Sequence, residues 1–143
     1  INDRLAVFSD ILSFLECVAS RKYVAIDFYD GSIMYDFANG KTTICDIDLF
    51  HKQPCVNDMG RMWGSSRFQS PEEYQLGADI GEITNVYTLG ATAFALFGEY
   101  NRTREKWQLS DKLFEIATRA VSDDRTKRQQ SIRQFTAEWE AAQ

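Results

Sequence analysis

The stretch from residue 23 to residue 50 constrains the fold more than any other part of the chain. Residues 32–37 alternate between apolar and polar side chains, and residues 42–47 are rich in β-branched side chains. Both patterns are typical of short strands. Asn39 and Gly40 lie between them, and this pair is the strongest short signal for a tight hairpin turn. The sequence therefore predicts an antiparallel β-hairpin.

Acidic residues stand at fixed positions around this hairpin. Asp27 ends a short apolar run over 23–26, which we expect to be a third strand, and Asp46 ends the second strand of the hairpin. A tight hairpin would hold the two carboxylates near each other. Two such acids suit a general base together with a ligand for a divalent metal ion.

The rest of the chain predicts helices. Apolar residues recur at helical spacing over 2–20, 111–121 and 129–142, and over 82–97 they lie on nearly all sides of the expected helix. Asn2 or Asp3 could cap the first helix. We predict one domain over residues 1–143, mainly α with a small antiparallel β-hairpin (α+β), in which residues 51–67 form a loop without regular structure.

Composition excludes several classes of function. The net charge of −5 argues against nucleic acid or an anionic membrane as the main partner, and no apolar run is long enough to span a membrane. Cys17, Cys45 and Cys55 are odd in number and lack metal-ligand spacing, so we expect free, buried thiols in the reducing cytoplasm. His51 is the only histidine, a loop residue by its context, which excludes multi-histidine metal sites.

The hairpin region resembles the catalytic loop and the metal-binding loop of protein kinases, whose pattern is H-R-D, four residues, N, and later D-F-G. Asp27 matches the catalytic Asp, Ser32 the Asn, and Asp46 the metal-binding Asp. The match is partial, because Ala25-Ile26 stand in place of His-Arg and Asp48 stands in place of the Gly.

A second resemblance lies at residues 64–72, GSSRFQSPE. They are similar to the end of a kinase activation segment, G-T-x-x-[YF]-x-A-P-E. The matching residues are Ser65, Phe68, Ser70, Pro71 and Glu72. The fixed φ of the proline also suits the start of a short helix.

Two later segments extend the resemblance. Residues 85–90 are similar to the family's D-x-[WY]-[ST]-x-G, and Asn85, in place of the Asp, can still accept a hydrogen bond from the catalytic loop. Residues 122–128 are similar to the connection that ends in an Arg, which is Arg128 here. In the family this Arg pairs with the Glu of A-P-E, so we expect a buried ion pair between Arg128 and Glu72.

The resemblance implies the C-terminal (large) lobe of a protein kinase-like domain, from a divergent serine/threonine protein kinase. Asp27 would take the proton of a hydroxyl on a protein or peptide substrate, and Asp46 would hold the Mg²⁺ that accompanies ATP. Ser32 could offer one oxygen to a second metal ion, and Ser65 could bond to Asp27. Tyr29 stands where such kinases usually carry a Lys, which removes a cation from the site.

Neither a Gly-rich loop nor a Lys-bearing strand precedes Asp27. We therefore expect the N-terminal (small) lobe to lie outside this chain and to be its intramolecular partner. The 143-residue chain alone would then be inactive, because half of the nucleotide clamp is missing. Apolar surface left exposed by the missing lobe could drive self-association of the chain.

Two alternatives remain open. A pseudokinase that serves as a binding or scaffolding module is favoured by the lack of His, Arg, Lys and Asn around Asp27. A small-molecule phosphotransferase of the aminoglycoside-kinase kind can have a metal loop that reads I-D-x-D, much as residues 45–48 do. The long loop and the S-P-E at residues 70–72 count against the second alternative.

Overall fold

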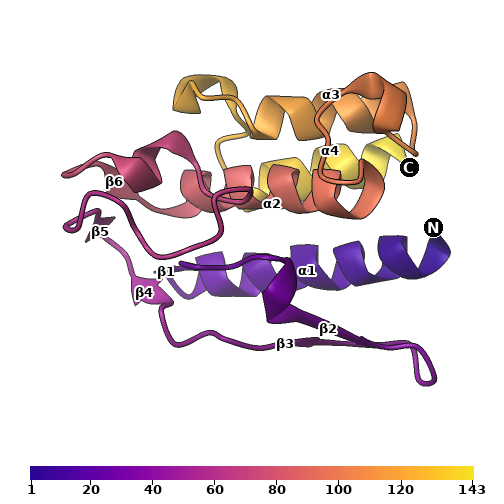
Figure 1. The fold of residues 1–143 in the computed structure, drawn as a ribbon, viewed down its shortest axis with the longest axis horizontal. Helices are drawn as coiled ribbons and strands as arrows, with labels where there is room; N and C mark the ends of the chain where they lie inside the picture. The colour runs from indigo at the N-terminus through magenta and orange to yellow at the C-terminus, as the bar shows by residue number, and fades with distance from the viewer.

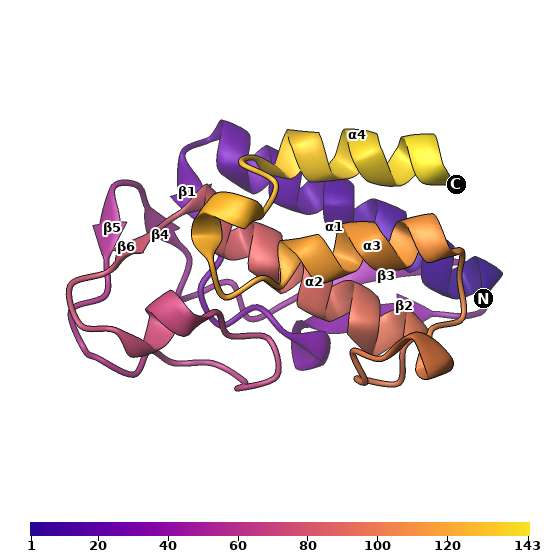
Figure 2. The same cartoon turned by 90° about the horizontal axis from the view of Figure 1, so that it is seen from above.

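Four α-helices make up most of the structure, a computed structural model that describes residues 1–143. They are α1 (Asn2–Ser20), α2 (Glu82–Phe97), α3 (Asp111–Ala120) and α4 (Ile132–Ala142). Helix α2 lies between α1 and α3 (Figure 1), and α4 packs against the other three helices (Figure 2). The chain is therefore mainly helical, as predicted.

Helix α2 is the centre of the core because it is apolar on nearly all sides. Its bounds agree with the prediction, and only four of its residues, Glu82, Ile83, Ala95 and Leu96, are not fully buried. Gly90 lets α3 approach closely: a Cβ atom at this position would lie 2.7 Å from the Cβ of Ala120. Aromatic rings fill the space between α2 and the neighbouring helices, including Phe8, Phe97, Trp107, Phe135 and Trp139.

Six short strands form three antiparallel pairs. They are β1 (Tyr23–Val24) with β4 (His51–Lys52), β2 (Ile33–Asp36) with β3 (Lys41–Ile44), and β5 (Cys55–Val56) with β6 (Asp79–Ile80). The β2–β3 hairpin runs along α1 (Figure 1), where the Thr42 hydroxyl donates a hydrogen bond of 2.6 Å to Asp10 of that helix. This makes the fold α+β.

The hairpin turn differs from the prediction. Asp36 pairs with Lys41, so the loop has the four residues 37–40 rather than Asn39 and Gly40 alone. The Asp36 carboxylate accepts hydrogen bonds from the backbone of Ala38 and Asn39 and from the Asn39 side chain. This capping stabilises the wider loop, and of its residues only Gly40 has a positive φ.

Several predicted boundaries were also wrong. The strands are shorter than expected, since β1 ends at Val24 and β3 ends at Ile44. Residues 51–67 include β4 and β5, whose partner residues lie 23 to 29 positions away along the chain, so no local pattern marks them. The last helix begins at Ile132 instead of residue 129, because the Ser131 side chain caps it. The first helix has Ile1 at its cap position, without a side-chain bond from Asn2 or Asp3.

The three cysteines are free, but none is fully buried as we expected, since Cys45 and Cys55 are half-buried and Cys17 is exposed. It lies on the side of α1 opposite the apolar stripe that includes Ile11, Leu15 and Val18. No helix combines the length and the apolar character needed to cross a membrane.

Candidate functional site

Asp27 and Asp46 come close together, although they follow different strands. Asp27 lies after β1 and Asp46 after β3, and both have a left-handed backbone, with φ of 58° and 56°. Residues other than glycine rarely adopt this conformation, which is typical of sites where the surrounding structure imposes it. Partial burial raises the pKa of the Asp27 carboxyl, and the nearby charge of Asp46 raises this pKa further. The two carboxylates therefore interact.

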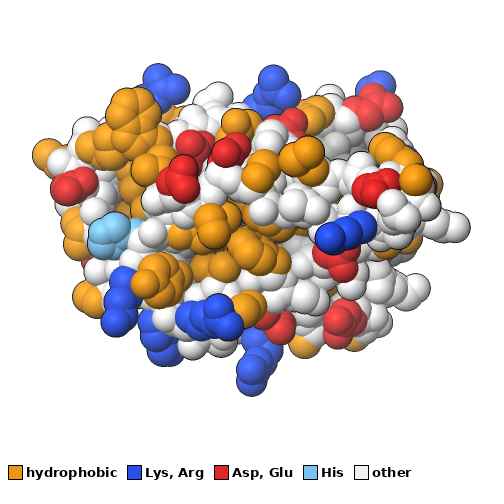
Figure 3. Space-filling model, turned by 90° about the horizontal axis from the view of Figure 1, so that it is seen from below, with side chains coloured by type: hydrophobic (Ala, Val, Ile, Leu, Met, Phe, Trp, Pro, Cys, Tyr) orange, Lys and Arg blue, Asp and Glu red, His pale blue; other side chains and the backbone are white.

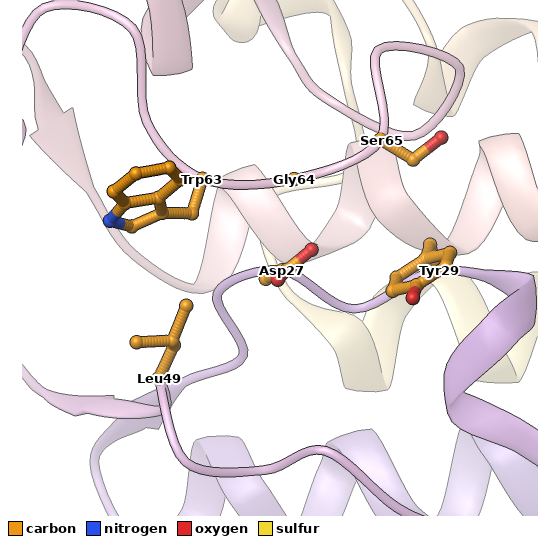
Figure 4. Close-up of a pocket in the computed structure, with 6 residues that line it drawn as sticks. All are labelled: Asp27, Tyr29, Leu49, Trp63, Gly64 and Ser65. Carbon is orange, nitrogen blue, oxygen red and sulfur yellow. The ribbon is translucent and has the colours of Figure 1, made fainter.

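Asp27 lines a pocket of about 580 Å³ together with Tyr29, Leu49, Trp63, Gly64 and Ser65. In Figure 4, residues 27–29 lie on one side of this pocket and residues 63–65 pass across it on the other. The hydroxyl of Ser65 points away from Asp27 and makes no hydrogen bond to it. The sequence had suggested a place near Asp27 for Ser65, but no sequence pattern placed Leu49 or Trp63 at this pocket.

Asn85 anchors the backbone just before Asp27. Its side-chain oxygen accepts a hydrogen bond of 2.7 Å from the Ala25 N–H, and its side-chain nitrogen donates one of 2.7 Å to the Ala25 carbonyl. Asn85 is buried in the first turn of α2, so both bonds are shielded from water. An aspartate could accept the first bond but could not donate the second. The loop is thus fixed to the central helix.

Arg128 and Glu72 form the buried ion pair that the sequence suggested. Arg128 donates hydrogen bonds to both carboxylate oxygens of Glu72, at 2.7 and 3.0 Å. It also donates to the carbonyls of Ser122 and Ile83, and its guanidinium lies 5.0 Å from the centre of the Tyr87 ring. Burial alone would raise the pKa of Glu72, but the hydrogen bonds and charge of Arg128 hold this pKa below its usual value.

The segment around Glu72 has a second buried carboxyl that sequence reasoning missed. Pro71 begins a short 3-10 helix, η2 (Pro71–Tyr74), and Phe68 and Ser70 just before it are buried. The Glu73 carboxylate accepts hydrogen bonds from the N–H and the hydroxyl of Ser70, at 2.6 and 2.9 Å. Burial raises the pKa of Glu73 to about 7. The spacing S-x-x-E is the signature of a capping box and could have revealed this contact.

The two aspartates could supply two carboxylate ligands to a magnesium ion, and the protein offers no further carboxylate, histidine or cysteine ligand beside them. Mg²⁺ usually takes one or two protein carboxylates and fills its other positions with water and phosphate oxygens, which suits Asp27 and Asp46. No group of three or more His, Cys, Asp or Glu side chains gathers anywhere in the chain. Ser32 is fully buried, its hydroxyl has no hydrogen-bond partner, and it does not line the pocket of Asp27. Ser32 thus does not suit a second metal ion at this pocket.

Apolar surface adjoins Asp27. Leu49 and Trp63 also line a second pocket of about 390 Å³, with Ile26, Val56 and Met59 among its other residues. Trp63 is 64% exposed, which is unusual for a side chain of this size. Figure 3 shows hydrophobic side chains exposed in the middle of one face of the molecule, with acidic side chains beside them. Such a surface is suited to contact with another molecule or domain.

No known family matches the sequence of this chain, and no curated protein matches it either.

Proposed function

We propose that this chain is the C-terminal lobe of a protein kinase-like domain, and that the complete protein transfers the γ-phosphate of ATP to a hydroxyl of a protein or peptide. The observation that carries the proposal is that Asp27 lines the pocket and that its carboxyl senses the charge of Asp46, which follows a different strand. The buried pair of Arg128 and Glu72 supports it, because these residues lie in the segments that resemble the kinase pattern.

In this proposal Asp27 acts as the general base. Its carboxylate accepts the proton of the acceptor hydroxyl while the hydroxyl oxygen forms a bond to the γ-phosphorus. The bond between the γ-phosphorus and the bridging oxygen breaks, and ADP leaves with that electron pair. A Mg²⁺ ion held by Asp46 would neutralise phosphate charge when bound. The raised pKa of Asp27 makes its carboxylate a stronger base than an ordinary aspartate.

The other residues of the site position these groups. Asn85 fixes the loop of Asp27 on α2, while Arg128 and Glu72 fix the segment that carries Ser65. The exposed apolar residues near Asp46, which include Ile47 and Leu49, would pack against a small lobe that covers ATP. A chain without that lobe would leave them open to self-association.

A pseudokinase is the second candidate, and two observations favour it. The hydroxyl of Ser32 is buried away from the pocket of Asp27, and no Lys or Arg lines this pocket. Both features weaken the binding and neutralisation of phosphate groups. A protein of this kind would bind partners through the same lobe without phosphoryl transfer.

Nucleotide binding to the complete protein tests the proposal. We expect calorimetry to show that Asp46→Asn lowers the affinity for Mg²⁺-ATP by about tenfold or more, since one charged metal ligand is lost. Asp48→Asn is the matched control, because Asp48 is also exposed and lies two residues further along the same loop. Asp27→Asn should abolish phosphorylation of a peptide mixture and leave binding intact.

Three outcomes would contradict parts of this scheme. Equal affinity of the wild type and Asp46→Asn would exclude the metal role of Asp46. Nucleotide binding without phosphorylation by the wild type would favour the pseudokinase. A complete protein that neither binds nucleotide nor phosphorylates peptide would refute the kinase proposal as a whole.

A further inference from the structure

We infer that the hydroxyl of Tyr29 donates a hydrogen bond to the phosphoryl group that is transferred beside Asp27. The inference rests on the proposed function and names a residue that orients the reacting group. Tyr29 lies two residues after Asp27, and both side chains line the same pocket (Figure 4).

The Tyr29 hydroxyl is free to bind a ligand. The side chain is half-buried and packs against the main hydrophobic core, yet its hydroxyl makes no hydrogen bond within the protein. The hydroxyls of Tyr35, Tyr74, Tyr87 and Tyr100 each have a partner, and the only other unpaired tyrosine hydroxyl is that of Tyr23, which is exposed and lies outside the pocket. The Tyr29 hydroxyl is not among the buried unpaired atoms of the protein, so it reaches solvent and can donate to a group that enters the pocket.

Gly31 provides the space that the Tyr29 ring occupies. A Cβ atom at residue 31 would lie 2.3 Å from the ring carbon Cε2 and 2.9 Å from the hydroxyl oxygen of Tyr29. The backbone of Gly31 lies in a short 3-10 helix, η1 (Asp30–Ser32), and does not have the positive φ that would require glycine. The absence of a side chain is therefore what matters at this position, and it determines where the Tyr29 ring lies.

The chemistry of the pocket calls for such a donor. A transferred phosphoryl group carries negative charge on its outer oxygens, and the Asp27 carboxylate would repel it. No Lys or Arg lines the pocket, whose remaining hydroxyl, on Ser65, points away from Asp27. Tyr29 can donate to a phosphoryl oxygen while Asp27 accepts the proton of the attacking hydroxyl. Tyr29 would thus contact the phosphoryl group, and Asp27 would contact the hydroxyl that attacks it.

Steady-state kinetics of the complete protein test this role. A hydrogen bond to a charged group corresponds to a rate effect of about 10- to 100-fold, so Tyr29→Phe should lower kcat by that factor. The KM values for ATP and peptide should change by less than about threefold, because the contact forms with the moving group. Tyr29→Lys supplies a donor again and should recover most of kcat.

Two further variants distinguish an effect of the Tyr29 hydroxyl from a general loss of folded structure. Gly31→Ala keeps the hydroxyl but displaces the ring, so it should lower kcat about as much as Tyr29→Phe. Tyr23→Phe is the matched control, because Tyr23 is exposed on β1 and lies outside the pocket. It should leave kcat unchanged, and the melting temperatures of Tyr29→Phe and Tyr23→Phe should agree with that of the wild type.

A chemical readout does not depend on turnover. N-acetylimidazole acetylates accessible tyrosine hydroxyls, and mass spectrometry of peptides assigns each site. Mg²⁺ with the non-hydrolysable nucleotide AMP-PNP and an acceptor peptide should slow acetylation of Tyr29 and leave that of Tyr23 unchanged.

The outcomes distinguish this inference from the proposed function. An active wild type in which Tyr29→Phe retains full kcat and Tyr29 is not protected would overturn the inference and leave the kinase proposal standing. If the protein binds nucleotide but does not transfer phosphate, protection of Tyr29 from acetylation would support the inference, and its absence would overturn the inference. A wild type that neither binds AMP-PNP nor phosphorylates peptide overturns both.

Discussion

Replacing Arg128 by methionine should reveal how strongly the segment around Glu72 is held. The Arg128 side chain is 0% exposed and that of Glu72 is 4% exposed, so their pairing at 2.7 Å is shielded from water. The variant loses these bonds and those to the carbonyls of Ser122 and Ile83. Glu72 keeps only the weaker contact with Arg125, at 3.6 Å. Leaving one buried charge without its partner costs about 3–5 kcal/mol, a large fraction of a typical unfolding free energy of about 5–15 kcal/mol.

Urea denaturation, followed by circular dichroism at pH 7, measures this loss. Arg119→Met is the matched control, because Arg119 pairs with Glu138 at 2.6 Å, with its side chain 43% exposed. An exposed pair of this kind contributes up to about 1 kcal/mol. The double variant Arg128→Met with Glu72→Met should cost less than the sum of the single variants by about 2 kcal/mol, because no charge is left without a partner.

The pH dependence gives an independent check. Since the pKa of Glu72 is lowered in the folded protein, the pair contributes stability that is fully present above the unfolded pKa of about 4.5. This stability is lost as the pH falls through the lower folded value, so the deficit of Arg128→Met should shrink in acid. Equal losses of unfolding free energy in Arg128→Met and Arg119→Met at pH 7 would refute the reasoning. So would a double variant whose loss equals the sum of the losses in the single variants.

Two further substitutions test the buried groups near the pocket. Because burial raises the pKa of Glu73 to about 7, the neutral form stabilises the fold fully below about pH 4.5 and this contribution is lost as the pH rises to 7. Glu73→Gln should therefore exceed the wild type in unfolding free energy by about 2–3 kcal/mol at pH 8 and match it near pH 4.5, and parallel pH curves would contradict this. Asn85→Ala leaves the Ala25 N–H and carbonyl unpaired and should cost about 2–4 kcal/mol in urea denaturation. Asn85→Asp should also destabilise, since a carboxylate repels the Ala25 carbonyl, and wild-type stability of that variant would show that the donated bond is dispensable.

Long periodic segments were predictable from the sequence, and short pairings were not. The bounds of α2 could be predicted, because its dense apolar residues lie between Gly81 and Gly98. Strands β4 and β5 have two residues each and depend on partners at β1 and β6. Two residues carry no periodicity, so only the folded chain shows that they pair.

The candidate site also contains residues that could be predicted from the sequence and residues that could not. Asp27 and Asp46 could be named from their positions around the hairpin, and the pairing of Glu72 with Arg128 from the order of the segments that resemble the kinase pattern. The walls of the pocket could not be predicted, because Leu49 and Trp63 lie in segments without a periodic pattern. Only the folded chain places these exposed side chains beside Asp27. For a related reason, spacing alone did not show that the hydroxyl of Ser32 is buried without a hydrogen-bond partner.

The first two turns of α2 determine the geometry of the pocket, although that part of the helix does not line it. Asn85 holds the loop of Asp27 on one side, and the carbonyl of Ile83 and the ring of Tyr87 contact Arg128, which holds Glu72 on the other. Both walls are therefore fixed to one rigid, buried element, so their separation depends on its packing. It follows that a change in the core beneath these turns alters the distance between the residues on the two walls without touching any of them. Stability and any activity of this site are thus coupled through α2.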